Sequence, residues 1–240
     1  IPEAEAAAQL ITDSTRAIVL VSPNNPGGVE YPAQTLRAFY ELARDRGLAL
    51  IVDETYRDFD SRTGAPHDLF ADPDWTGTLV HLYSFSKAYR LTGHRVGAMV
   101  ADTARLAEVE KFLDTVAICP GQIGQHAALW GMRNLAQWVA GERDEILTRR
   151  AAMAEGLAGL DGWTTLGCGA YFAYVTHPYT LPSDLAAQRL VRDAGVLLLP
   201  GTMFMPKTNP DGARQMRIAF ANVDTTGISD LMDRLRKTRF

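Results

Sequence analysis

Short apolar runs alternate along the first part of the chain with segments whose apolar residues recur at helical spacing. The nearly continuous apolar runs lie at residues 16–22, 48–54, 78–84 and 95–101. Between the first two, residues 32–47 begin with Pro32, space their apolar residues three to four apart and stop at Gly47, as a helix does. Strands that are apolar throughout are covered on both faces, so this pattern predicts a mainly parallel central sheet flanked by helices.

The pattern changes after residue 102, where helical spacing takes over. The elements predicted beyond it are helices within 102–135, at 141–160, near 183–194 and from about 225, and strands at 169–177, 196–201 and 216–223. We therefore predict an α/β fold in two domains. A large domain occupies residues 1–145, and a smaller C-terminal α+β domain occupies residues 146–240.

Composition narrows the possible partners of this 240-residue chain. Its net charge of −4 gives no basic surface, so nucleic acid is not an expected partner. No apolar run approaches the roughly 18 to 20 residues that a membrane span needs, so no membrane partner is expected either. Cys119 and Cys168 match no metal or redox spacing. This usage predicts no metal site and suits a reducing, cytoplasmic location.

Three of the predicted strands end in polar clusters. The clusters are VSPNNPGG (21–28), VDETYRDF (52–59) and YSFSKAYR (83–90). Each alone has an ordinary explanation: turn chemistry for the first, strand-end capping by Asp53 for the second, and solvated or paired charges for the third. Together they indicate more, because ligands bind beyond the carboxyl ends of the strands in an open parallel sheet.

The third cluster and the residues just after it suit a phosphate group. Ser84 and Ser86 offer hydroxyl donors, and Arg95 offers a guanidinium fork. Lys87 lies in the same turn, and an amine held beside a bound phosphate suggests a Schiff base to a phosphorylated aldehyde.

The other two clusters add the remaining requirements of one cofactor. Asp53 could hold a pyridine nitrogen protonated, and Asn25 with Tyr56 could hydrogen-bond a phenolate oxygen. Pyridoxal 5′-phosphate needs a phosphate site, an amine, a carboxylate beside its ring nitrogen and donors to its phenolate oxygen. The carboxylate is needed because the ring acts as an electron sink only while the nitrogen stays cationic. The residues therefore predict a pyridoxal-phosphate site.

Four motifs resemble the successive signatures of the class I/II aminotransferases, which are fold-type I pyridoxal-phosphate enzymes. The motifs are SPNNPGG, DETYRDF, SFSKAYRLTGHRVG and RIAFANV. The resemblance runs from about residue 10 to the C-terminus. Because the chain begins at Ile1 without a methionine, an N-terminal part of such an enzyme is expected to be missing.

The resemblance implies a role for each site residue. The implied cofactor-binding residues are Asn25, Asp53, Tyr56, Ser84, Ser86, Lys87 and Arg95. Of these, Lys87, Asp53 and Tyr56 would be catalytic, with Lys87 forming the internal aldimine. Arg217 would bind the α-carboxylate of the substrate together with Asn25. The family is also homodimeric, with active sites at the subunit interface.

Several positions depart from the family pattern. Gly27 precedes Gly28 where threonine or serine commonly precedes the glycine. His94 stands where many members have tryptophan, and Met205 stands where glycine is common. The upstream glycine-containing phosphate loop and the aromatic residue that stacks on the ring are not found within these 240 residues.

The resulting hypothesis is an amino-acid aminotransferase that works through a Lys87 aldimine, with Lys87 as general base. A carboxylate clamp at Arg217 favours transamination over decarboxylation. Two alternatives remain: a C–S β-lyase of the same fold, and the aminotransferase-like effector domain of a transcription regulator. The sequence does not specify which amino acid and 2-oxo acid react.

Overall fold

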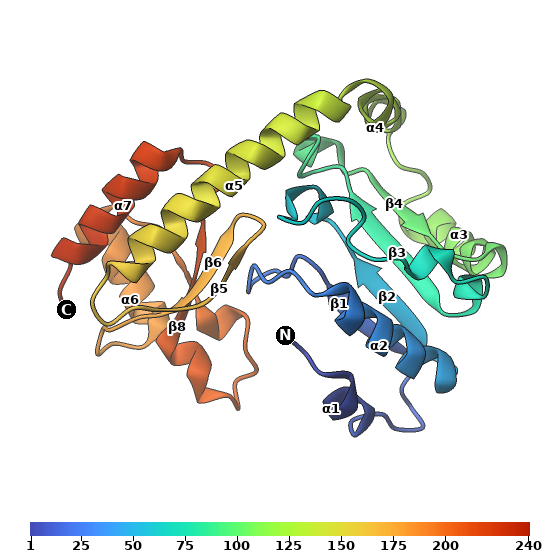
Figure 1. Ribbon diagram of the computed structural model, residues 1–240, viewed down its shortest axis with the longest axis horizontal. Coiled ribbons are helices and arrows are strands. Elements are labelled where there is room, and N and C mark those ends of the chain that lie inside the picture. The colour runs from blue at the N-terminus through green and yellow to red at the C-terminus, as the bar shows by residue number, and fades with distance from the viewer. The chain divides into compact units, whose positions relative to one another are not determined.

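The structure is a computed structural model that describes residues 1–240 (Figure 1). The chain forms two compact units. The first unit comprises Ile1–Pro23 and Glu30–Glu142, and the second comprises Asn24–Val29 and Arg143–Phe240. The loop of residues 24–29 therefore belongs to the second unit, although it directly follows the first strand of the first unit.

A four-stranded sheet forms the centre of the first unit. Its order is β1 (Ala17–Val21), β2 (Ala49–Asp53), β3 (Leu79–Ser84) and β4 (Gly97–Val100). The first three strands are parallel and β4 runs antiparallel to β3. The α/β fold with a mainly parallel sheet is thus confirmed.

Burial of the strands depends on their place in this sheet. Leu50 and Val52 of the inner strand β2 are fully buried, as continuous apolar strands predict. The edge strands differ: every residue of β4 is exposed, and so is Val19 of β1. Continuous hydrophobicity overstated the burial of these two edges.

The helices of the first unit are α1 (Ala4–Ala8), α2 (Ala33–Asp45), α3 (Thr103–Val116) and α4 (Gln122–Asn134). Helix α2 buries Leu36, Phe39, Tyr40 and Ala43, the face that the spacing predicted, and it contacts β1 and β2. Pro32 stands at its N-terminal boundary, and Gly47 follows it with a φ of +63°, a left-handed conformation that glycine adopts without strain. Asp102 caps the N-terminus of α3, and its side chain accepts a hydrogen bond from the backbone N–H of Arg105.

The second unit contains an antiparallel sheet in the order β5 (Thr164–Gly169), β6 (Phe172–Thr176), β8 (Gln215–Ala219) and β7 (Leu199–Pro200). The long helix α5 (Ala136–Ala158) runs from the end of the first unit into the second, which also holds α6 (Ser183–Arg189) and α7 (Thr225–Lys237). Strand β5 was not predicted. Its sequence, TTLGCG, has no apolar run, and it pairs with β6 along an exposed strand.

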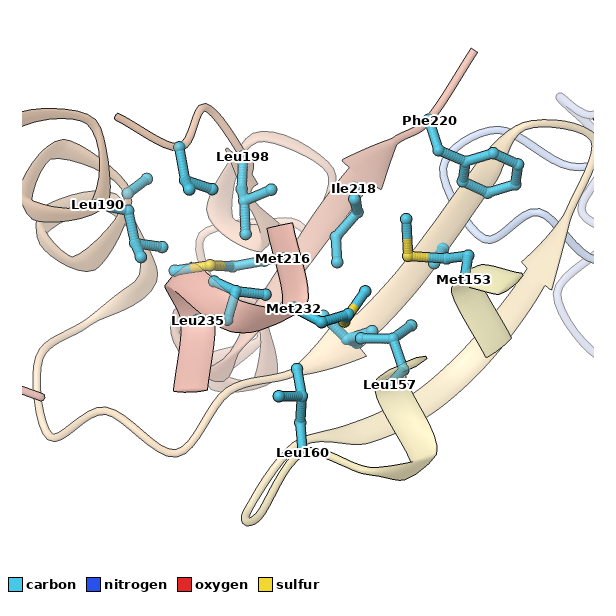
Figure 2. Close-up of a cluster of buried hydrophobic side chains, with 14 of the residues drawn as sticks. Met153, Leu157, Leu160, Leu190, Leu198, Met216, Ile218, Phe220, Met232 and Leu235 are labelled. Carbon is cyan, nitrogen blue, oxygen red and sulfur yellow. The ribbon is translucent and has the colours of Figure 1, made fainter. Parts of the chain in front are cut away.

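A buried core joins the sheet of the second unit to its helices. Figure 2 shows side chains of α5, β8 and α7 that pack together there, among them Met153, Leu157, Met216, Ile218, Met232 and Leu235. Each such side chain contributes about 1.5–3 kcal/mol when it is fully buried. Because side chains alternate along a strand, burial of Met216 and Ile218 on this face directs Arg217 to the opposite face of β8.

None of the helices is long and apolar enough to cross a membrane.

Candidate active site

The three parallel strands end at the same edge of the first sheet. In the strand register, Val21 of β1 pairs with Asp53 of β2, and Asp53 pairs with Leu82 of β3. Ser84 follows two residues later, at the end of β3. The polar residues after β2 and β3 therefore share one edge, which is where parallel sheets bind ligands.

The segment that follows β3 brings together all three predicted phosphate donors. The Ser84 Oγ accepts a hydrogen bond from the backbone N–H of Ser86 at 3.3 Å. The Arg95 Nη1 lies 3.4 Å from the Ser86 Oγ and donates to the carbonyl of Thr92 at 2.9 Å. Both serine hydroxyls act only as acceptors in these contacts, and the arginine uses only its Nη1, so the three groups retain donors for an anion.

The backbone of Arg95 is in an uncommon conformation. Its φ of +52° and ψ of +48° lie in the left-handed region, where a residue with a side chain costs about 1–3 kcal/mol. The short 3₁₀ turn Thr92–His94 precedes it. Such backbone strain persists only where the surrounding structure fixes it. In this conformation the guanidinium of Arg95 lies beside the Ser86 hydroxyl.

Backbone hydrogen bonds and an aromatic cluster fix the same loop. The Phe85 N–H donates to the carbonyl of Val96, and the Leu91 N–H donates to the carbonyl of Phe85, both at 3.2 Å. The buried Phe85 ring contacts the rings of Tyr83 and Tyr89, with centroids 5.0 and 5.5 Å away. These contacts hold the segment that carries Ser86 and Lys87.

Lys87 and Tyr56, two of the predicted site residues, lie close together. The Lys87 Nζ is 5.9 Å from the centroid of the buried Tyr56 ring. Tyr56 precedes a 3₁₀ turn, Arg57–Phe59, after β2. The interactions of Lys87 include no carboxylate, so its amine has no competing ion pair.

Asp53 ends β2 and is partly buried. Its Oδ1 accepts hydrogen bonds from the Thr55 N–H at 2.9 Å and from the Thr55 hydroxyl at 2.6 Å. Both bonds use the same oxygen, and Oδ2 makes no hydrogen bond to protein. The carboxylate is thus fixed in direction with one oxygen available.

A second hydrogen bond ties the turn after β2 to β3. The Tyr83 hydroxyl donates to the Asp58 Oδ2 at 2.5 Å. Burial, followed by the charge of Asp58, raises the pKa of the Tyr83 phenol, so it remains a donor. Sequence reasoning did not identify this pair, although both residues lie in the polar clusters, because their contact depends on the pairing of β2 with β3.

The second unit brings together the two residues predicted to bind substrate. The Arg217 Nη1 donates to the Asn25 Oδ1 at 2.6 Å. The guanidinium carbon also lies 4.7 Å from the centroid of the Phe172 ring and 4.9 Å from that of Phe204. The sequence predicted Arg217 and Asn25 but missed both rings, which direct the guanidinium through cation–π contacts.

Glycine is required where the loop that carries Asn25 contacts β6. Gly28 has a φ of +71°, and a Cβ there would lie 2.5 Å from the carbonyl oxygen of Phe172. A Cβ on Gly169 would lie 2.0 Å from the carbonyl oxygen of Gly28. Only backbone fits between them, and this contact explains why residues 24–29 belong to the second unit.

Two of the positions that depart from the family pattern pack against glycines. A Cβ on Gly124 of α4 would lie 3.1 Å from the Cβ of His94, and a Cβ on Gly212 would lie 3.1 Å from the Cβ of Met205. Each side chain therefore occupies space that a small neighbour leaves open.

Comparison with known proteins identifies the family. Residues 2–235 match aminotransferase class I and II, and the chain belongs to this family. It is 34% identical over 208 residues to an arginine–pyruvate transaminase of Pseudomonas aeruginosa, a match that covers 85% of this chain and 52% of the relative. A probable aspartate/prephenate aminotransferase of Thermus aquaticus is 31% identical over 210 residues, covering 85% of this chain and 53% of the relative.

The fold agrees with this assignment. An aspartate aminotransferase from Thermus thermophilus with maleate superposes with a TM-score of 0.86 at 26% identity. That match covers 99% of this chain and 60% of the solved one. The chain thus spans about half the length of the curated relatives that it matches.

The residues present fit the cofactor of this family, pyridoxal phosphate. A phosphate dianion suits the donors at Ser84, Ser86 and Arg95, because no carboxylate is among the partners of that arginine. A protonated ring nitrogen suits the available oxygen of Asp53, and an aldehyde suits the amine of Lys87.

Proposed function

We propose that the intact protein is a pyridoxal-phosphate-dependent aminotransferase that moves an amino group between an amino acid and a 2-oxo acid. One observation carries the proposal. A lysine without an ion-pair partner lies in the same loop as a group of anion donors, at the edge of the sheet where Asp53 ends the neighbouring strand. The relatives named above support it, since one is a transaminase of arginine and pyruvate.

Each residue then has a defined task. Ser84, Ser86 and Arg95 bind the phosphate, and the negative charge of Asp53 favours a proton on the ring nitrogen. Bound pyridoxal phosphate supplies an electron sink for the pair released at the α-carbon of the amino acid. Lys87 would offer the amine that anchors the cofactor, and once the amino group of the substrate has displaced it, its freed Nζ would remove the α-proton as general base.

Tyr56 and Asn25 complete the proposed arrangement by hydrogen-bonding the phenolate oxygen. Arg217 binds the α-carboxylate of the amino acid through a bidentate contact, and Phe172 and Phe204 keep its guanidinium in place. A carboxylate bound in this way is retained during the reaction. This arrangement favours transamination over decarboxylation.

We further propose how the chain is organised and where it acts. Residues 1–145 form part of the cofactor-binding domain, and residues 146–240 form the small domain. The intact protein is a homodimer with active sites at the subunit interface, as the family resemblance implies. The two free cysteines support a cytoplasmic location.

Borohydride reduction tests the central assignment in the intact protein loaded with pyridoxal phosphate. Peptide mapping should find the pyridoxyl label on Lys87. Lys87→Arg should abolish both the label and turnover, and Lys207→Arg, a control at an exposed lysine, should retain both. A label on another lysine would show that the assignment is wrong.

A panel of amino donors with 2-oxoglutarate and pyruvate tests the reaction type. Turnover should require a 2-oxo acid acceptor. Pyruvate release from cystathionine without an acceptor would instead indicate a C–S β-lyase.

A further inference from the structure

A buried carboxylate follows Asp53 directly. The side chain of Glu54 is fully buried, and three groups surround its two oxygens. The His81 Nε2 lies 2.9 Å from Oε2, the Arg57 Nη1 lies 3.2 Å from the same oxygen, and the His67 Nε2 lies 3.3 Å from Oε1. The roles proposed above for the cofactor site do not use any of these four residues.

The two histidines differ in how their ring nitrogens are bonded. The His67 Nδ1 accepts from the backbone N–H of Leu69 at 3.2 Å, so the proton of that ring lies on the Nε2 that faces Glu54. The His81 Nδ1 is buried without a partner, and a second proton there would leave a buried donor unsatisfied. The Glu54 carboxylate therefore lies beside one guanidinium, that of Arg57, and two imidazole rings, and of these rings only that of His81 is aligned for a hydrogen bond to it.

Aromatic rings close the cluster. The Phe70 ring contacts the rings of His67 and His81, with centroids 6.0 and 5.7 Å away, and the Trp75 ring meets Phe70 edge-on at 5.1 Å. Burial alone would raise the pKa of Glu54. The two histidines and the charge of Arg57 nevertheless lower it to about 2, so the carboxylate is ionised.

Glu54 connects the end of β2 to β3 and to the turn that follows Tyr56. Its backbone N–H donates to the carbonyl of Leu82 on β3 at 2.9 Å, and its carbonyl accepts from the Arg57 N–H at 3.0 Å. Its side chain reaches β3 again through His81, 27 residues away in sequence. Asp53 precedes this junction by one residue and Tyr56 follows it by two.

We propose that Glu54 is a positioning residue, which fixes the direction of the Asp53 carboxylate and of the Tyr56 ring by joining the end of β2 to β3 and to the Arg57–Phe59 turn. A buried ion pair is weak evidence for a role in stability alone, because apolar side chains of similar size often serve as well. Asp53 and Glu54 are consecutive, and their carboxylates have different surroundings. If the backbone between them is held in place by the contacts of Glu54, the direction of the Asp53 carboxylate is held as well. The inference rests on the proposed function above.

Glu54→Gln in the intact protein loaded with pyridoxal phosphate tests the inference. The amide keeps the size of the side chain but carries no charge for Arg57, and its NH₂ group opposes an imidazole donor. We expect the Kd for pyridoxal phosphate to rise at least tenfold and the midpoint of the pH titration of its absorption band to shift. We expect kcat to fall at least tenfold, with KM for the amino acid within threefold because Arg217 is untouched.

The matched control is Asp60→Asn. It breaks another ion pair in the connection between β2 and β3, in which Asp60 binds Arg62, and should lower Tm without changing the Kd, the spectrum or kcat.

If Glu54→Gln does not fold, His81→Phe offers a second test. It removes one donor to Glu54 and should change the Kd, the spectrum and kcat in the same direction. Variants that lower Tm alone would overturn the inference and leave the proposed function intact. A wild-type protein that does not bind pyridoxal phosphate would overturn both.

Discussion

Asp53 and Glu54 show how differently two consecutive acids can be used at the end of one strand. Asp53 keeps one oxygen available at the sheet edge, whereas Glu54 is enclosed by Arg57, His67 and His81. Only the first was predictable. The chemistry of Asp53 belongs to a local motif, but the partners of Glu54 include residues 13 and 27 positions away whose approach depends on the register of β2 and β3.

Glu54 also predicts how stability depends on pH. Its pKa falls from an ordinary 4.5 to about 2 in the folded protein, so folding favours the ionised form. A lowered pKa gives stability that is complete above about pH 4.5 and is lost as the pH falls toward 2. The shift corresponds to about 3 kcal/mol, of which about 2 kcal/mol is lost by pH 3.

Urea unfolding at pH 6 and pH 3 measures this effect. The difference in unfolding free energy between the wild type and Glu54→Gln should shrink by about 2 kcal/mol between the two values. Glu5→Gln, at an exposed carboxylate of α1, should show almost no such change because exposed charges contribute little. A difference that stays constant from pH 6 to pH 3 would mean that Glu54 is not held as an anion by its neighbours.

At the scale of elements, the sequence predicted helices better than edge strands. Helix α2 shows its period through Leu36, Phe39, Tyr40 and Ala43, because one face alone is buried. Strand β5 gave no signal, since glycines and threonines pair along its exposed length. Strand β7 is shorter than predicted because Pro200 has no N–H to donate and the chain turns at Gly201.

Two glycines of α5 separate intrinsic helix preference from packing. Nothing lies within 4 Å of a Cβ built on Gly141, but a Cβ on Gly156 would lie 2.6 Å from the Cγ of the buried Met232. Gly141→Ala should therefore raise the unfolding free energy by up to about 1 kcal/mol. Gly156→Ala should lower it by about 1–3 kcal/mol, because the added methyl group overpacks the core between α5 and α7.

Thermal and urea unfolding of both variants in the same buffer would check this pair. Equal stabilisation by the two substitutions would mean that Met232 moves aside without cost, and the contact between α5 and α7 would then be looser than it is drawn in Figure 2.

At the scale of the whole molecule, the sequence did not predict which residues belong to which of the two units. The motif with Asn25 follows β1 directly, yet its loop belongs to the second unit because Gly28 meets the backbone of Phe172 and Gly169. That contact joins residues far apart in the chain, and no local sequence pattern indicates it. The motif residues themselves were predictable, because their chemistry is local and their strands end at one edge.

The 240-residue chain also exposes an apolar stripe on α3 that predicts its behaviour in solution. Phe112 and Val116 lie one turn apart on the helix and remain 66% and 64% exposed, and Leu113 beside them is exposed as well. Contiguous apolar surface of this kind promotes association. The purified chain should therefore self-associate at micromolar concentrations and bind a hydrophobic dye. Phe112→Glu combined with Val116→Lys should reduce both self-association and dye binding by at least severalfold, with little change in Tm because neither side chain is buried.

The control is Leu10→Lys, which removes a single apolar residue that lies elsewhere and is 79% exposed, and it should change neither self-association nor dye binding. Static light scattering across a dilution series would measure the association directly. A monodisperse monomer at all concentrations, or equal behaviour of the double variant and Leu10→Lys, would contradict the role assigned to the stripe.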